Sequence, residues 1–122
     1  MTENHHNLSH HGQDQAKIAQ LEKVETAIVK CFGSLLTQMK SKSEADSTLL
    51  DQTSILFGSN LGNANAHDPR NLPTFLAGGG FKHGQYVAAK KDTPLCNLFV
   101  SMLNQVGIQQ ETFGQSDGVI SL

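Results

Sequence analysis

The sequence predicts an α/β fold in which a long amphipathic helix, short and mostly parallel strands and a C-terminal helix form part of a layered domain. Three observations lead to this expectation: a long segment with apolar residues at every third or fourth position, two short apolar runs without polar alternation, and a second helical pattern near the end. Strands that are apolar on both faces are typical of parallel sheets covered by helices. We therefore expect part of a three-layer fold, a fragment of a larger domain.

The first predicted element is a histidine-rich loop over residues 1–14, which contains only one sizeable aliphatic side chain after Met1. The rest of the chain, residues 15–122, is expected to form the C-terminal part of one α/β domain. It begins with a helix over residues 15–42, with Asp14 as the N-cap. Its apolar stripe, which we expect to pack by one face, comprises Leu21, Val24, Ile28, Cys31, Leu35 and Met39, widened by Phe32 and Leu36.

Two short strands follow the helix. The first is predicted over residues 53–57, where a nearly unbroken apolar run ends at Gly58. A long loop over residues 58–72 leads to the second strand, over residues 73–77. Because neither run alternates between apolar and polar residues, we expect the two strands to lie in a buried, parallel sheet.

A glycine triplet and a second helix complete the predicted elements. Residues 78–80 are all glycine and fit a tight turn, whereas the phosphate-binding patterns GxxxxGK[ST] and GxGxxG are missing. After a hairpin-like excursion with Gly84 at its turn and a weak strand over residues 86–88, Thr93 and Pro94 introduce a helix over residues 94–106. We expect no nucleotide cofactor.

These elements are too few to cover both faces of a parallel sheet, which leaves its edges bare. We expect the sheet to be completed either by a missing N-terminal region or by self-association through an exposed sheet edge. An isolated chain of 122 residues with such a sheet should be only marginally stable.

The composition excludes several classes of protein. The net charge is −2 and the lysines are scattered, so we expect no nucleic-acid binding. No apolar run approaches the roughly 20 residues that span a bilayer, and the N-terminal residues form no targeting signal. Cys31 and Cys96 lack the spacing of metal or redox motifs and are expected to be buried apolar residues.

Four of the six histidines, His5, His6, His10 and His11, lie within the first eleven residues. Imidazole is a common metal ligand, but neighbouring residues of an extended segment point to opposite sides, so this cluster offers at most two ligands per ion. Further ligands would come from elsewhere, such as His67 or Asp68. The alternative is a solvated loop whose histidines cap neighbouring backbone groups.

The loop over residues 58–72 is the second candidate site. In open α/β sheets, ligands bind beyond the carboxyl ends of strands, where Asn60, Asn63 and Asn65 would provide contacts beside His67 and Asp68. Asparagines also suit an irregular loop, because they tolerate left-handed backbone and bond to their own main chain. Both interpretations stay open for the asparagines.

The order of these motifs resembles the C-terminal portion of a bacterial family known as domain of unknown function 1552. The resemblance rests on HHNLSHHG, a long helix, TLLDQTSILFGSNLGNANAHDPRNLPTFLAGGG, TPLCNLFVSMLNQVGI and ETFGQSDG, which together cover nearly the whole chain. It implies an exported protein, periplasmic or extracellular, of which this chain lacks the N-terminal part.

A more distant resemblance connects the chain to the alkaline phosphatase and sulfatase superfamily. It implies an alkaline-phosphatase-like fold and a metal site in which His10 or His11 takes the place of the first histidine and His67 that of the last. Asn60 and Leu61 stand where that superfamily has an Asp-His metal pair, and leucine binds no metal.

The resemblance leaves three functions to compare, and no catalytic residue is assigned. The first is a part of an exported protein without activity of its own, which we favour. The second is a metal-dependent phosphate or sulfate ester hydrolase, active when complete. The third is a small histidine-based protein that binds one divalent metal such as zinc, through His10, His11, His67 and Asp68.

Overall fold

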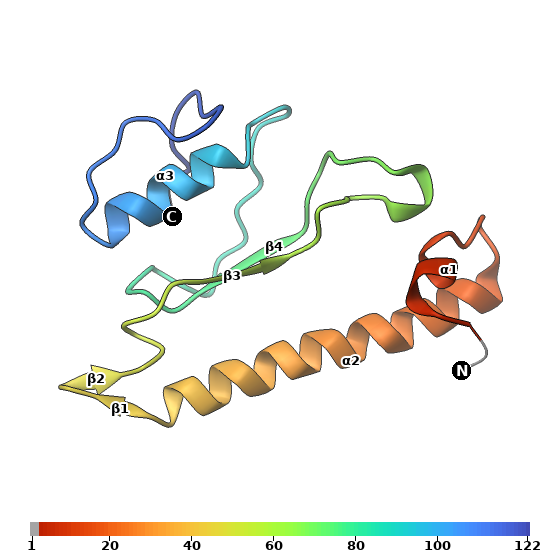
Figure 1. The fold of residues 1–122 in the computed structure, drawn as a ribbon, viewed down its shortest axis with the longest axis horizontal. Helices are drawn as coiled ribbons and strands as arrows, with labels where there is room; N and C mark the ends of the chain where they lie inside the picture. The colour runs from red at the N-terminus through yellow and green to blue at the C-terminus, as the bar shows by residue number, and fades with distance from the viewer. Residues whose placement is uncertain (1–2) are drawn as a thin grey trace. The chain divides into compact units, whose positions relative to one another are not determined.

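A computed structural model describes residues 3–122 and shows a mixture of helices and small sheets, so the chain is α/β in general (Figure 1). Its helices are α1 (His5–Ser9), α2 (Gln15–Lys40), the short 3-10 helix η1 (Ala64–Ala66) and α3 (Cys96–Gln105). Its strands are β1 (Ser43–Glu44), β2 (Ser47–Thr48), β3 (Ile55–Gly58) and β4 (Thr74–Ala77).

Helix α2 begins where the sequence predicts. The carboxylate of Asp14 accepts hydrogen bonds from the backbone N–H groups of Ala16 and Lys17, which confirms it as the N-cap. The expected burial of one face is only partial, because no residue of α2 is fully buried. Cys31 is exposed, so the prediction that it lies in a core is wrong.

Helix α1 lies within the segment that the sequence predicts to be a loop. The side chain of Asn4 accepts a hydrogen bond from the N–H of Asn7 at 2.9 Å and so caps this five-residue helix. Leu8 has no exposed surface, and α1 contacts α2 (Figure 1). The single aliphatic side chain of the segment is therefore enough to attach a helix that is too short to be stable alone.

The prediction of parallel strands is wrong, since both sheets are two-stranded and antiparallel. Strands β3 and β4 are neighbours in one sheet because the chain between them folds back as a long hairpin (Figure 1). Beyond the strands, the N–H of Ser59 donates to the carbonyl of Pro73 at 3.2 Å, and Asn63 and Asp68 form an antiparallel bridge. In the other sheet, β1 and β2 form a small hairpin directly after α2.

The chain divides into two compact units. The first contains the described residues up to Ser41 together with Leu56–Phe75. It contains an aromatic cluster: the ring of Phe32 in α2 stacks on Phe57 at a centroid distance of 4.6 Å and lies 6.1 Å from the ring of Phe75. Aromatic pairs at such distances contribute about 0.5–1.5 kcal/mol beyond their buried area.

The second unit contains Lys42–Ile55 and Leu76–Leu122 and is organised around α3. Leu98 and Val100 are its buried apolar residues. The side chain of Asn97, only 5% exposed, donates to the carboxylate of Asp117 at 2.8 Å and accepts the N–H of Asp117 at 3.0 Å. This two-way pairing holds the C-terminal segment against α3.

The glycine triplet forms the tight turn that the sequence predicts. Gly78, Gly79 and Gly80 have φ values of 69°, 64° and 74°, in the left-handed region that favours glycine. A Cβ on Gly79 would overlap the side chain of Ser54. The weak strand expected over residues 86–88 does not form; these residues are irregular and exposed.

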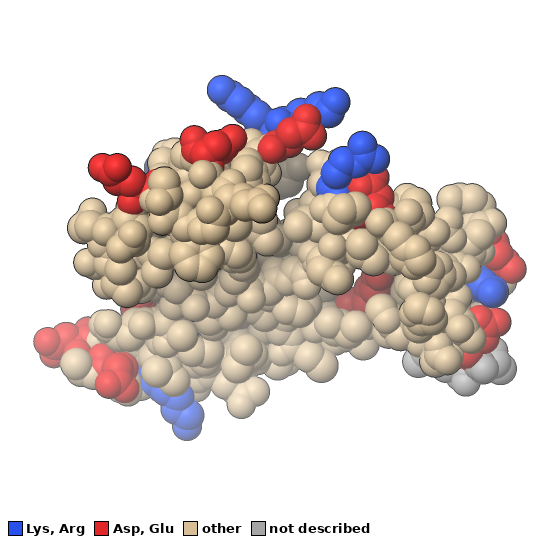
Figure 2. Space-filling view, turned by 45° about the horizontal axis from the view of Figure 1, so that its top comes forward, with Lys and Arg blue, Asp and Glu red and all other residues tan. Residues whose placement is uncertain are grey.

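Among residues 3–122, no helix has the length and apolarity needed to cross a bilayer. On the face shown in Figure 2, basic side chains form small separate groups, several of them next to acidic ones, with wide uncharged areas between them.

Candidate metal centre

Two histidines that lie 57 positions apart in the sequence meet within the first unit. His10 follows the last turn of α1, and His67 follows η1 at the tip of the hairpin between β3 and β4. Their Nε2 atoms are 3.2 Å apart, and their rings meet edge to face at a centroid distance of 4.7 Å. The structure thus brings together two of the four predicted metal ligands.

Helix α1 positions His10. The N–H of His10 donates to the carbonyl of His6 at 3.2 Å and continues the helical turn, which places both rings on the same side at a centroid distance of 4.8 Å. An extended segment would not have this spacing. His6, which sequence reasoning did not assign, therefore becomes the nearest neighbour of the pair within α1.

A left-handed backbone positions His67. Its φ and ψ are 50° and 35°, and its N–H donates to the carbonyl of Ala64 at 3.2 Å. Asn63 caps η1 by accepting the N–H of Ala66 at 3.1 Å. A left-handed residue other than glycine costs about 1–2 kcal/mol, so the surrounding hydrogen bonds hold His67 in a conformation that it would otherwise leave.

A second contact joins the same two segments. The side-chain oxygen of Asn65 accepts the backbone N–H of Gly12 at 2.8 Å. Gly12 comes two residues after His10 and Asn65 two residues before His67, so this hydrogen bond fixes the hairpin tip beside the end of α1. Asn63 thus acts on the loop's own backbone and Asn65 on the backbone of the N-terminal segment, while Asn60 is exposed on the loop.

The surroundings of His10 favour its neutral form. Partial burial, followed by the neighbouring imidazoles of His6 and His67, lowers the pKa of His10 below its ordinary value. A neutral imidazole is the form that binds a metal ion. His10 therefore stays neutral down to a lower pH than an ordinary histidine does.

The other two predicted ligands point elsewhere. The Nδ1 atom of His11 accepts the N–H of Gln13 at 3.1 Å. The carboxylate of Asp68 is paired with Arg70, with oxygen–nitrogen distances of 2.8 and 2.7 Å. Hydrogen bonds from Arg70 lower the pKa of Asp68 to about 2. The structure therefore assigns Asp68 to an ion pair within the hairpin.

The separation of the two Nε2 atoms fits a tetrahedral metal ion. Two nitrogen ligands with bonds of about 2.0–2.1 Å lie roughly 3.3–3.4 Å apart around a tetrahedral ion, whereas ligands at right angles lie roughly 2.8–3.0 Å apart. The observed 3.2 Å is closer to the tetrahedral value, and it is also within hydrogen-bond distance. Within residues 3–122, no three His, Cys, Asp or Glu side chains are placed to hold an ion together. The pair therefore provides two ligands, which leaves the remaining positions to solvent or to another molecule.

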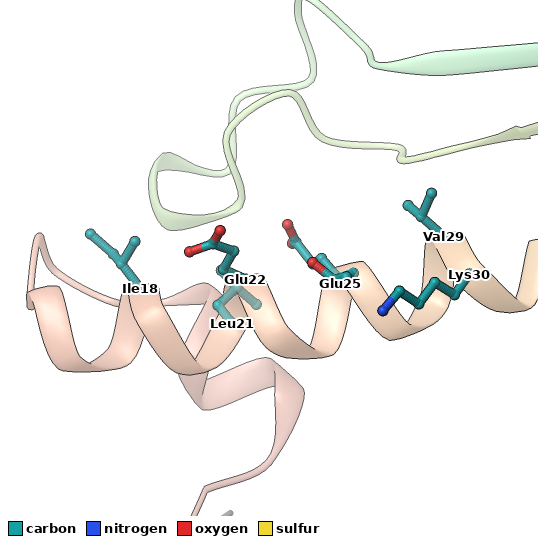
Figure 3. A pocket seen from close by; sticks show the side chains of 7 residues that line it. Ile18, Leu21, Glu22, Glu25, Val29 and Lys30 are labelled. Carbon is teal, nitrogen blue, oxygen red and sulfur yellow. The ribbon is translucent and has the colours of Figure 1, made fainter.

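A shallow open groove along α2 is another concave feature of the first unit, and sequence reasoning missed it. Figure 3 shows Ile18, Glu22 and Val29 on one side of α2, with Glu25 and Lys30 nearby. Leu21 and Thr26 complete its lining. Its lining comes from a single helix, so it is open to solvent instead of enclosed like a typical ligand pocket, and the histidine pair is the stronger candidate site.

No protein-family model, curated protein or solved structure matches this chain.

Proposed function

We propose that this chain is a histidine-based metal-binding module that holds one divalent ion between His10 and His67. The observation that carries the proposal is the 3.2 Å separation of the two Nε2 atoms. Zinc is the best-matched ion, because it accepts nitrogen ligands in tetrahedral geometry and tolerates water at the other positions. The ion would join the N-terminal segment to the hairpin tip, next to the hydrogen bond between Gly12 and Asn65.

The expected affinity follows from the number of ligands. Zinc sites with four protein ligands bind with about 10–16 kcal/mol, and a site with two ligands should reach roughly half of that. This corresponds to a Kd on the order of 1–100 µM. At a free zinc concentration a hundred times the Kd, the bound ion would stabilise the folded chain by about 2.7 kcal/mol.

Calorimetric titration with zinc tests the proposal. His10→Gln and His67→Asn each remove one imidazole, and Asn tolerates the left-handed backbone of position 67. His5→Gln is the matched control, since His5 also lies in α1 but outside the pair. We expect each pair variant to bind zinc at least tenfold more weakly, with a further loss in the double variant and no change in the control. An equal loss in all three single variants would contradict the proposal.

A synthetic peptide of residues 1–12 separates the pair from the histidine cluster alone. The peptide contains His10 but not His67. We expect it to bind zinc at least tenfold more weakly than the full chain. Equal affinities would show that the N-terminal cluster binds the ion without the hairpin.

We further propose that the module belongs to an exported protein, as the resemblance to domain of unknown function 1552 implies, and that it has no hydrolytic activity of its own. Leu61 occupies a position where the resemblance to the alkaline phosphatase superfamily requires a second histidine, and its N–H donates to the hydroxyl of Ser59 at 3.2 Å as part of the loop. Hydrolysis of an aryl phosphate or aryl sulfate that disappears in His10→Gln would overturn the second of these proposals and favour a metal-dependent ester hydrolase.

The proposed partner is a second copy of the chain, attached through an exposed sheet edge. Strands β3 and β4 form a two-stranded sheet, so each has one edge without a neighbouring strand in the described part of the chain. Sedimentation equilibrium should show concentration-dependent association. A monomer at all concentrations that melts cooperatively would contradict it.

A further inference from the structure

The segment between β4 and α3 carries a local positive charge in a chain whose net charge is negative. Residues 82–91 contain Lys82, Lys90 and Lys91 and no acidic residue, and Asp92 follows them directly. The segment has no helix or strand and runs as an irregular trace into α3 (Figure 1). We call residues 82–91 the lysine loop.

The base of the lysine loop is attached to the second unit. A ring nitrogen of His83, Nε2, lies 3.0 Å from the carbonyl oxygen of Gly78, within hydrogen-bond distance. The neighbouring carbonyl of Gly79 accepts the side-chain amide of Gln105 in α3 at 3.0 Å. The glycine turn therefore links the start of the loop to α3, so the loop is presented from a fixed base.

Two turns enclose the tip of the loop. In the first, Gly84 has a φ of 82° and the side chain of Gln85 donates to the carbonyl of Lys82 at 3.1 Å. In the second, the N–H of Thr93 donates to the carbonyl of Lys90 at 3.2 Å. One lysine thus begins each turn, and the four residues between the turns, 86–89, form the tip.

The tip is apolar and exposed. Tyr86 is 92% exposed and Val87 is 42% exposed, and both alanines that follow are exposed as well. A tyrosine with this exposure leaves its whole ring in water, although tyrosine rings favour sites with one apolar and one wet end. An apolar tip between lysines matches the layers of a membrane surface, where aromatic rings lie at the headgroup level and lysine ammonium groups reach the phosphates.

We infer that the lysine loop docks on an anionic lipid surface. Tyr86 and Val87 would enter the boundary between headgroups and acyl chains, while Lys82, Lys90 and Lys91 would contact lipid phosphates. Each lysine near an anionic surface contributes about fivefold to binding. Three of them together contribute about a hundredfold.

The composition of the tip favours lipid over single-stranded nucleic acid. Nucleic-acid surfaces use several aromatic rings on which successive bases stack, and the lysine loop has one. Val87 and the two alanines offer nothing to a base, but they reduce the cost of entering a lipid interface.

The sequence provides a direct probe of the tip. Because Tyr86 is the only tyrosine and the chain has no tryptophan, the fluorescence emitted above about 300 nm comes from Tyr86 alone. Vesicles of phosphatidylglycerol and phosphatidylcholine with brominated acyl chains quench a ring that enters the interface. We expect quenching of Tyr86 by these vesicles at low salt and none by brominated phosphatidylcholine alone.

Matched variants test the charge and the apolar tip separately. The triple variant Lys82→Gln, Lys90→Gln and Lys91→Gln should lower vesicle affinity about a hundredfold. The control triple Lys23→Gln, Lys40→Gln and Lys42→Gln removes the same charge from exposed positions elsewhere, and should lower affinity less than about fivefold. Val87→Ser should weaken binding in flotation assays without changing its salt dependence.

Three results would overturn the inference. They are equal losses in the two triple variants, vesicle binding without quenching of Tyr86, and binding to single-stranded oligonucleotides that exceeds binding to the anionic vesicles.

Discussion

Leu8 is the side chain on which the position of His10 depends, so truncating it connects the fold to the site. Leu8 is fully buried and is the only buried residue of α1. A five-residue helix is not stable in isolation, so its docking on α2 depends on this side chain. Leu→Ala substitutions at buried positions cost about 2–5 kcal/mol. We expect Leu8→Ala to lower the free energy of docking α1 by about 3 kcal/mol.

Hydrogen exchange measures this loss locally. The N–H of Leu8 donates to the carbonyl of Asn4 at 3.1 Å, and that of His10 donates to the carbonyl of His6 at 3.2 Å. A loss of about 3 kcal/mol lowers the protection of these amides about a hundredfold. Because docked α1 holds His10 beside the hairpin, zinc affinity should fall in parallel.

Leu35→Ala is the matched control, since Leu35 is 45% exposed on α2. It should leave the protection of the α1 amides within about threefold of its original value. Unchanged protection in Leu8→Ala, or an equal decrease in both variants, would refute the argument that one buried side chain fixes the position of His10.

Three further predictions concern other parts of the chain. Arg70 lowers the pKa of Asp68 to about 2. Their pairing therefore stabilises the folded chain at pH values above the ordinary pKa of the carboxyl, and this stability is lost as the pH falls through about 2. A titration midpoint of the Asp68 carboxyl near 3.8 by NMR would contradict this. Gly79→Ala should lower the free energy of unfolding by more than about 1 kcal/mol, because a Cβ at this position overlaps Ser54. Gly33→Ala, in open space on α2, should raise the free energy of unfolding by about 0.5–1 kcal/mol. Chemical denaturation measures both changes. Asn97→Ala should cost about 1–3 kcal/mol and increase exchange in the C-terminal segment, and unchanged exchange would show that its side-chain bonds do not hold that segment.

The helices were the most predictable part of the fold. The expected helix over residues 15–42 is observed as Gln15–Lys40, and that over 94–106 as Cys96–Gln105. Both have apolar spacing that acts locally, and Asp14 caps α2 as predicted. The cap predicted at Thr93 is wrong, because α3 begins after Leu95 without a side-chain cap. Helix α1 was missed because it has a single apolar residue and its cap is Asn4, whose role depends on the backbone that it caps.

The strands were located but not paired correctly. The expected runs 53–57 and 73–77 are observed as Ile55–Gly58 and Thr74–Ala77. An unbroken apolar run indicates burial, but it does not say which strand lies beside it or in which direction. The antiparallel pairing arises from the loop between the strands, which closes through its own bridge between Asn63 and Asp68. The polar segment that became the β1–β2 hairpin had no strand signal at all.

The candidate site, too, was only partly predictable from the sequence. His10 and His67 were predicted as ligands of one ion, and the structure places them in contact. The role of Asp68 was not predictable, because its partner Arg70 pairs with it only once the hairpin forms. His6 was undecided because its place beside His10 requires α1, whereas an extended segment would separate the two rings.

X-ray absorption spectroscopy of the zinc-loaded chain counts the imidazole rings bound to the ion. We expect nitrogen and oxygen ligands at about 2.0 Å and the outer-shell scattering of two imidazole rings per zinc, reduced to one ring in His67→Asn. Zinc surrounded by oxygen alone, or an imidazole signal that His10→Gln and His67→Asn leave unchanged, would contradict the proposal that this histidine pair is the metal site.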